Sequence, residues 1–270
     1  MPSTDLLVSC EHLVKVYDSP TGRVQAVRGV DLELPRGVKA AVVGPSGSGK
    51  SSLLRMVAGL DRPTAGLVTI AGTDLSALRP GRRARVRAEL LTHVYQRPAA
   101  NLLAHLTAYQ QLDRIARPRR DRTVVVGDVL ERLGLGHRVD HVPAALSGGE
   151  QQRLAFARAA VADHRLVIAD EPTAQLDPDS AAAVLDTIDY LAERGTTVLI
   201  ATHDHRVLGR LDEIVTLRDG AVASIVRGGT ELAVIDRSGR LQLPPHVLEH
   251  FPERSARLDW DGESLSVDPP

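Results

Sequence analysis

Short runs of consecutive apolar residues alternate along this chain with longer segments in which apolar residues recur every three or four positions. The short runs are typical of strands buried on both faces of a partly parallel sheet, and they lie at 40–43, 166–169 and 198–201. The longer segments have the periodicity of helices, and they lie at 51–58, 149–162 and 180–194. The pattern predicts an α/β fold with a mixed, partly parallel sheet at its core.

Two regions depart from this alternation. The first is richer in arginine, leucine and alanine and predicts a helical lobe over about 75–145, extending to 160, inserted between core strands. The second follows a spacer at 227–229, where alternating residues predict a strand, a turn at Ser238-Gly239, a second strand, a short helix and a final hairpin. We therefore expect one large domain at 1–226 and a small β-rich module at 230–270.

Composition limits the possible functions. The 270 residues suffice for one large α/β domain with a small appendage. The 33 basic and 34 acidic residues nearly cancel, so no global field favours nucleic acid, and none is expected as a partner. Cys10 is the only cysteine, which excludes an intrachain disulfide framework and fits a reducing cytosol. Neither a signal peptide nor an apolar stretch of about 18 residues occurs, so the chain is not expected to span a membrane by itself.

A glycine-rich segment between the strand at 40–43 and the helix at 51–58 has the pattern of a phosphate-binding loop, G-x-x-x-x-G-K-S. Its glycines let successive backbone N–H groups converge on phosphate oxygens, helped by the positive end of the helix. Lys50 is expected to reach the β- and γ-phosphates, and the Ser51 hydroxyl to bind Mg²⁺. The nucleotide-binding residues expected here are Gly44, Pro45, Ser46, Gly47, Ser48, Gly49, Lys50, Ser51 and Ser52.

Two further segments carry chemistry. Asp170 and Glu171 end an apolar strand at the edge of the sheet where ligands of open α/β sheets collect, and buried acids there need a cation or partners. The segment Ser147-Gly148-Gly149-Glu150 has the spacing of a capping box at a helix start. Two glycines in a first turn weaken a helix by about 1 kcal/mol each. Capping does not call for them, whereas close approach of the backbone to a phosphate explains them.

Together these segments resemble the nucleotide-binding subunit of ATP-binding cassette (ABC) transporters, and the likeness covers about residues 5–225. The resemblance implies a P-loop ATPase that binds ATP and Mg²⁺. It makes Asp170 a residue that holds Mg²⁺ and Glu171 the residue that polarises the attacking water. His203 resembles the histidine that contacts the γ-phosphate and orients Glu171, and Lys50 belongs to the same catalytic set.

The resemblance assigns three more roles. Gln96 resembles the residue that senses Mg²⁺ or water, Tyr17 the aromatic residue that stacks on adenine, and Asp177 the residue that couples two ATP sites. The ABC signature corresponds to Ser147, Gly148, Gly149 and Glu150, and in this family it completes the ATP site of another subunit. The chain carries one phosphate loop and one signature, so we expect a second nucleotide-binding subunit, with the chain itself forming a homodimer.

Within the family, the segment 101–107, NLLAHLT, resembles the NLLPHLT of LolD/MacB-like ATPases. This implies a separate integral-membrane permease of the FtsX/MacB-like kind, and a cytoplasmic protein held at the inner face of the cell membrane. Two alternatives remain open at this point. One is a regulatory or force-transmitting complex in which no substrate crosses the membrane. The other is a soluble ABC ATPase of DNA repair or ribosomes, although the long coiled coils, zinc cysteines and fused cassettes of those proteins are not present in the sequence.

The appendage resembles the swapped-hairpin module of AbrB/SpoVT-type proteins, whose signature D-x-x-G-R-x-x-L-P corresponds to 236–244. About 40 residues hardly bury a stable core alone, so we expect this tail to dimerise with a second copy. Relatives of the module often bind DNA. Here eight acidic residues against four arginines disfavour a phosphate-binding face.

Overall fold

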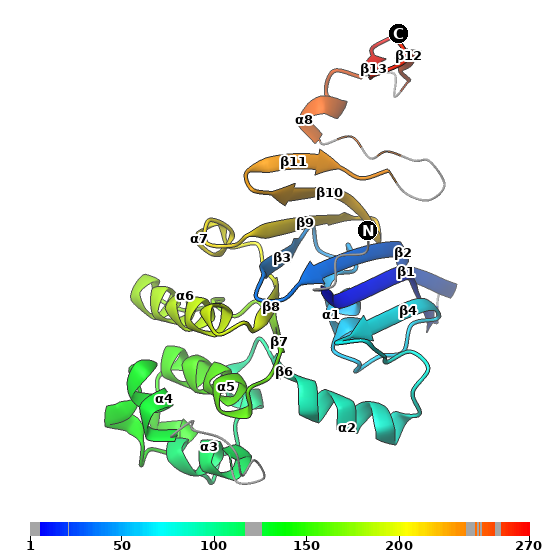
Figure 1. Cartoon of the computed structure of the whole chain (residues 1–270). Coiled ribbons are helices and arrows are strands. Elements are labelled where there is room, and N and C mark those ends of the chain that lie inside the picture. The colour runs from blue at the N-terminus through cyan, green and yellow to red at the C-terminus, as the bar shows by residue number, and fades with distance from the viewer. Residues whose placement is uncertain are drawn as a thin grey trace.

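The computed structural model describes residues 6–20, 22–116, 126–235, 241, 243, 245–251 and 255–270. A seven-stranded sheet in the order β11-β10-β9-β3-β8-β7-β6 forms its centre (Figure 1). Its strands are β3 (Lys39–Val43), β6 (Leu91–Val94), β7 (Leu166–Asp170), β8 (Thr197–Ala201), β9 (Glu213–Arg218), β10 (Ala221–Arg227) and β11 (Thr230–Ala233). The five strands from β9 to β6 pair in parallel, whereas β10 and β11 are antiparallel. The predicted mixed, partly parallel core sheet is confirmed.

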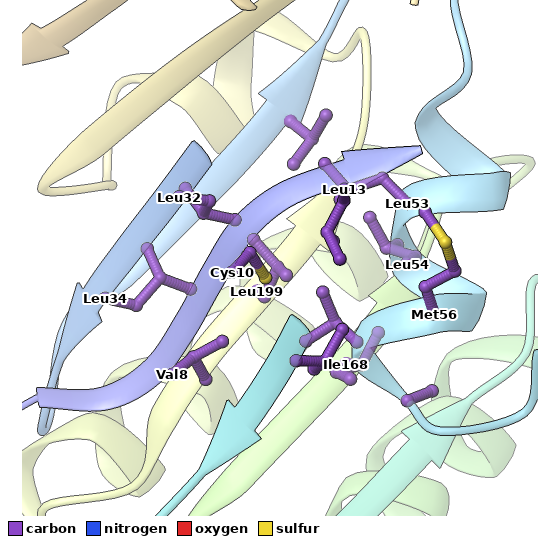
Figure 2. Packing of buried hydrophobic residues seen from close by; sticks show 14 of the residues in the cluster. Val8, Cys10, Leu13, Leu32, Leu34, Leu53, Leu54, Met56, Ile168 and Leu199 are labelled. Carbon is purple, nitrogen blue, oxygen red and sulfur yellow. The ribbon is translucent and has the colours of Figure 1, made fainter. Parts of the chain in front are cut away.

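A second, antiparallel sheet of four strands in the order β2-β1-β4-β5 packs beside the first. Its strands are β1 (Leu6–Ser19), β2 (Gly22–Pro35), β4 (Ala65–Ile70) and β5 (Thr73–Asp74). Between the two sheets lies a buried cluster to which helix α1 (Lys50–Val57) contributes Leu53, Leu54 and Met56. Figure 2 shows these side chains pointing toward Leu13 on β1 and Ile168 on β7. The first helix is thereby fixed between two sheets.

The remaining helices form a second layer and a lobe. Their bounds are α2 (Pro80–Leu90), α3 (Ala108–Ala116), α4 (Val126–Arg132), α5 (Gly148–Ala162), α6 (Pro178–Glu193) and α7 (His205–Leu208), with short 3-10 turns η1 (Pro98–Asn101), η2 (Gly136–Arg138) and η3 (Pro143–Ala145). Helices α5 and α6 cover the face of the central sheet opposite α1, and α3 and α4 pack against α5 at one end. The predicted helices at 51–58, 149–162 and 180–194 are confirmed within three residues.

Alternate side chains of the central strands enter different cores, because successive residues of a strand point to opposite faces. On β7, Leu166 and Ile168 join the cluster with α1, while Val167 and Ala169 join the cluster with α5 and α6. The neighbouring β8 divides its residues in the same way. This double burial explains why these strands read as continuous apolar runs in the sequence.

One predicted boundary is wrong. The helical lobe was expected from about residue 75, but β6 (Leu91–Val94) is a strand of the central sheet and pairs in parallel with β7. The strand has four residues and follows the arginine-rich α2 directly, without a glycine or proline between them. Because so short a strand shows no clear period, its burial in the sheet determined its conformation.

The C-terminal tail adds little to the core. Strand β11 pairs with β10 at the edge of the sheet, and α8 (Pro245–Leu248) and the hairpin of β12 (Arg257–Trp260) and β13 (Leu265–Asp268) follow (Figure 1). The predicted final hairpin is confirmed, whereas the turn at Ser238-Gly239 lies outside the described residues. On the hairpin, Leu258 is 65% and Trp260 62% exposed. In the part of the chain that the structure describes, no helix has the length and apolarity needed to cross a membrane.

We expect Leu199→Ala to lower the free energy of unfolding by about 2–5 kcal/mol, because it leaves a cavity at a fully buried position in the central sheet. Leu258→Ala is the matched control, since the same atoms are removed from an exposed side chain, and we expect a change within about 0.5 kcal/mol. Urea denaturation of both variants measures the difference. Equal losses would contradict the described core.

Candidate functional site

The phosphate-binding loop joins β3 to α1 at the carboxyl end of the parallel strands. Its last residue, Gly49, has a left-handed φ of 99° and caps α1 without a side-chain hydrogen bond. A Cβ at this position would lie 2.3 Å from the Ala26 carbonyl oxygen, so only glycine fits. The Lys50 ammonium donates to the carbonyl oxygens of Gly44 (2.6 Å) and Pro45 (2.9 Å). The loop thus presents the N-terminus of a helix and a lysine at one point, which is a site for a phosphate.

The acid pair lies beside this loop. The Ser51 hydroxyl donates to Asp170 over 3.3 Å, which joins the start of α1 to the end of β7. Glu171 has a left-handed φ of 46°, and its N–H donates to the carbonyl of Ala201 on the neighbouring strand. Its Oε1 lies 2.7 Å from Nδ1 of His203. Three separate segments of the sequence therefore meet at one edge of the sheet.

Burial acts on the charge of Asp170. Removal from water raises the pKa of Asp170 above its usual range; the Ser51 hydroxyl and Lys50 oppose this rise, and Glu171 adds to it. The Glu171 side chain is 15% exposed, whereas that of His203 is 83% exposed. A cation beside Asp170 would compensate the burial of its charge. Ser51 and Asp170 supply oxygen ligands, which are the ones that Mg²⁺ prefers, so this donor pair fits that ion.

Sequence reasoning missed a link beside this site. The Thr173 hydroxyl donates to Asp204, and the Arg206 guanidinium forms a bidentate pair with the same carboxylate. The Arg206 hydrogen bonds come first among the causes that lower the pKa of Asp204 to about 2. Asp204 directly follows His203, so the loop that carries the histidine is joined to the segment after Glu171. An Asp after a strand and before a short helix was the available signal, since such residues cap helices.

The signature lies at the start of α5, on the opposite face of the central sheet from α1. Ser147 caps this helix and Glu150 completes the predicted capping box. Burial opposes the charge of Glu150, but hydrogen bonds from Ser147 and Arg138 hold its pKa at about 2. Ser147 and Gly148 are exposed, so their backbone is accessible to a ligand.

The two signature glycines have different surroundings. Gly149 is buried, and a Cβ there would come within 2.7 Å of the Ser180 Cβ on α6. Packing between the two helices is therefore sufficient to require a glycine at this position. For Gly148 the nearest atom would be Leu176 Cδ2 at 3.4 Å, an ordinary contact.

The other three predicted site residues, Gln96, Tyr17 and Asp177, lie in different elements. Gln96 is exposed and follows β6, in a loop held by Asn101, whose side chain bonds both backbone groups of Tyr95. Tyr17 is half-buried on β1, and its hydroxyl donates to Asp61. Asp177 caps α6 by accepting from Ser180 N–H, which is the first cause of its lowered pKa.

The described side chains include no group of three or more His, Cys, Asp or Glu that could hold a metal ion.

Comparison with known proteins agrees with this arrangement. The profile of the "ABC transporter" family matches residues 27–174. The lipoprotein-releasing system ATP-binding protein LolD of Shewanella frigidimarina is 42% identical over 222 residues, 79% of this chain and 91% of that protein. LolD of Legionella pneumophila (strain Paris) is 39% identical, over 81% of this chain and 97% of its own length.

Two solved structures are also similar. The dimeric structure of MJ0796, described as a bacterial ABC transporter cassette, has a TM-score of 0.73 and 29% identity over 82% of this chain and 98% of its own. The post-hydrolysis dimer of the same cassette, bound to ADP and Pi, has a TM-score of 0.71 and 30% identity over 82% of this chain. About a fifth of this chain lies outside these matches.

We expect Gly149→Ala to destabilise the protein by about 1–3 kcal/mol, because the new methyl group would overlap Ser180. The direction of this change in stability is informative, because alanine normally stabilises a helix relative to glycine by about 1 kcal/mol. Gly148→Ala is the control and is expected to retain or raise stability. Adding Ser180→Gly should recover much of the loss, and thermal unfolding of the set measures it. A stabilised Gly149→Ala protein would refute the packing account.

Proposed function

Because the chain belongs to the ABC transporter family, we propose that its phosphate loop, acid pair and His203 form one half of an ATP site that a second copy of the chain completes. The chain is an ATP-binding and ATP-hydrolysing subunit of a transporter, of LolD type. The observation that carries the proposal is the meeting of Ser51, Asp170, Glu171 and His203 at one edge of the sheet.

ATP is held by the residues of the loop. The backbone N–H groups of 44–52, apart from Pro45, which has none, surround its phosphates. Lys50 reaches the β- and γ-phosphates, and Tyr17 stacks on the adenine. Ser51, Asp170 and Gln96 would hold Mg²⁺, which would supply positive charge against the phosphates of ATP. Lys50 exchanges its bonds to the loop carbonyls for bonds to phosphate oxygens.

Hydrolysis is assigned to the contact between Glu171 and His203. The low exposure of Glu171 keeps bulk water away from its carboxylate, and the bond to Ala201 sets its backbone. From that position the carboxylate accepts a proton from the water that attacks the γ-phosphorus, while the bond from this phosphorus to the β,γ-bridging oxygen breaks and ADP leaves in line. His203, 2.7 Å away, holds the carboxylate in place and contacts the γ-phosphate.

The second copy is needed because the signature and the phosphate loop lie on opposite faces of the same sheet. Two copies arranged head to tail place each Ser147 and Gly148 against the ATP of the other. Asp177, at the start of α6, is then near the boundary between the copies and couples the two sites. ATP is the contact that closes this dimer, and hydrolysis releases it.

The permease is assigned to a groove in the helical lobe. The groove has a volume of about 790 Å³ and is lined by α2, β6, the segment 100–103 and α3. Tyr95 and Leu103 are 43% and 47% exposed along it. A membrane partner of the FtsX/MacB-like kind fits the NLLAHLT segment, whose residues 101–103 line the groove. This partner holds the chain at the cytoplasmic face of the cell membrane.

The tail is proposed to be a module of AbrB/SpoVT type that pairs with its copy. Leu258 and Val267 are cross-strand partners on one face of the hairpin, and Leu258 and Trp260 are largely exposed there. A two-stranded hairpin alone is at best marginally stable in water. The ATP-closed dimer brings two tails into one assembly, which raises their effective concentration.

We expect Glu171→Gln to lower ATP turnover by about 10²–10⁴-fold, because amide nitrogen and oxygen cannot accept the proton of the attacking water. With Leu258→Asp added to remove the proposed tail contact, the same variant should form a dimer when ATP and Mg²⁺ are present and remain a monomer with ADP. Sedimentation velocity and phosphate release measure both effects. Asp113→Asn, an acid removed far from the loop, is the control. Unchanged turnover in Glu171→Gln would overturn the assignment.

We expect Leu258→Asp to weaken nucleotide-free self-association by about tenfold or more, because it places a charge on the apolar face of the hairpin. Asp259→Asn changes the neighbouring residue on the other face of the same strand and should leave association unchanged. Sedimentation equilibrium without nucleotide gives both dissociation constants. A monomeric parent protein, or equal dimers in all three proteins, would reject the tail interface.

A further inference from the structure

The carboxylate of Glu150 is bound on both sides. Its Oε2 accepts the Ser147 N–H over 2.7 Å, and its Oε1 accepts Arg138 Nε over 2.8 Å. In return the Glu150 N–H donates to the Ser147 hydroxyl. The conformation of Ser147 is therefore determined by a carboxylate that is itself held by an arginine.

The surroundings of Glu150 hold its carboxylate charged and in one position. Glu150 is 8% exposed, and His137 approaches the same Oε1 at 3.5 Å. With a pKa of about 2, Glu150 is ionised at neutral pH, so its bond to Arg138 is charge-assisted throughout. A buried carboxylate with only the Ser147 contacts would leave one oxygen poorly satisfied, and Arg138 supplies that partner.

Arg138 belongs to a segment that is tied to another helix. It ends η2, and its carbonyl accepts the N–H of His141. The first turn of α3 donates to the same segment: Ala108 N–H to the His141 carbonyl at 2.9 Å, and Tyr109 N–H to the Val139 carbonyl at 3.0 Å. Helix α3 also lines the groove of the lobe. The segment 136–146 thus joins the wall of the groove to the signature.

We propose that Arg138 is a positioning residue for the ATP site of the second copy, because it fixes Ser147 through Glu150 and ties both to α3. The inference rests on the proposed two-copy site. Without Arg138, the backbone of Ser147 and Gly148 samples more conformations, and closing the dimer on ATP then has to order them. A partner that moves α3 acts on the signature through the same bonds.

The test uses the full chain with Glu171→Gln and Leu258→Asp, so that ATP is bound without turnover and the tails do not form a dimer by themselves. Adding Arg138→Gln is expected to raise the ATP concentration for half-maximal dimer formation by about tenfold, the effect of losing one charge-assisted hydrogen bond. Binding of Mg²⁺·ADP, which occupies only the chain's own phosphate loop, should be unchanged. Arg85→Gln is the matched control, since Arg85 forms an exposed ion pair with Glu89 on α2.

A merely structural role predicts something different, namely parallel losses in thermal stability, ADP affinity and dimer formation. A double-mutant cycle with Glu150→Gln separates the positioning role from the structural role. If Arg138 acts through Glu150, the effects of the two substitutions on dimer formation are not additive. We expect the double variant Arg138→Gln/Glu150→Gln to be no weaker than the poorer single variant, and Arg138→Lys to recover part of the loss. Additive effects, or an unchanged ATP midpoint in Arg138→Gln, would overturn the inference. If the Glu171→Gln parent does not dimerise with ATP, the proposed function fails first.

Discussion

The double burial of the central parallel strands is the constraint on which the rest of the structure depends. Strands β7 and β8 divide their side chains between two cores, and β3, which pairs with β8, is buried at Ala40, Ala41 and Val42. A shift of any of these strands by one residue would exchange the side chains that fill the two packed layers. Their carboxyl ends are consequently fixed side by side. The phosphate loop, the acid pair and His203 all follow these ends, and their meeting within hydrogen-bond distance is a result of strand register.

The same sheet separates the parts of the site. Helix α1 packs on one face and α5 on the other, so a single chain holds the phosphate loop and the signature apart by the thickness of its own core. In the proposed two-copy site, nucleotide chemistry thereby depends on association. The loops that the proposal places against the second copy are held internally: Thr173 to Asp204, Asp177 to Ser180, and Ser147 to Glu150. The surface that meets a partner is ordered before it does so, which lowers the entropic cost of closing.

Much of the fold and of the candidate site could be predicted from the sequence, because the residues that specify them are close together in the chain. A loop after an apolar strand, with Lys50 at a helix start, specifies its own geometry, and so do the capping residues Ser147 and Asp177. What failed depended on distant contacts. The short strand β6 is determined by its pairing with β7, and Gly149 by the approach of α6, neither of which has a local signature. The bonds of Asp204 to Thr173, 31 residues away, were missed for the same reason.

The position of Trp260 in the tail hairpin determines what the intrinsic fluorescence of this protein reports. Trp260 is the only tryptophan of the chain, and it is 62% exposed on β12, outside both buried clusters. Intrinsic tryptophan fluorescence of this protein therefore reports on the surroundings of one side chain in the tail. Events in the cassette reach that signal only if they change the environment of the hairpin, so the unlabelled protein carries a natural probe of its appendage.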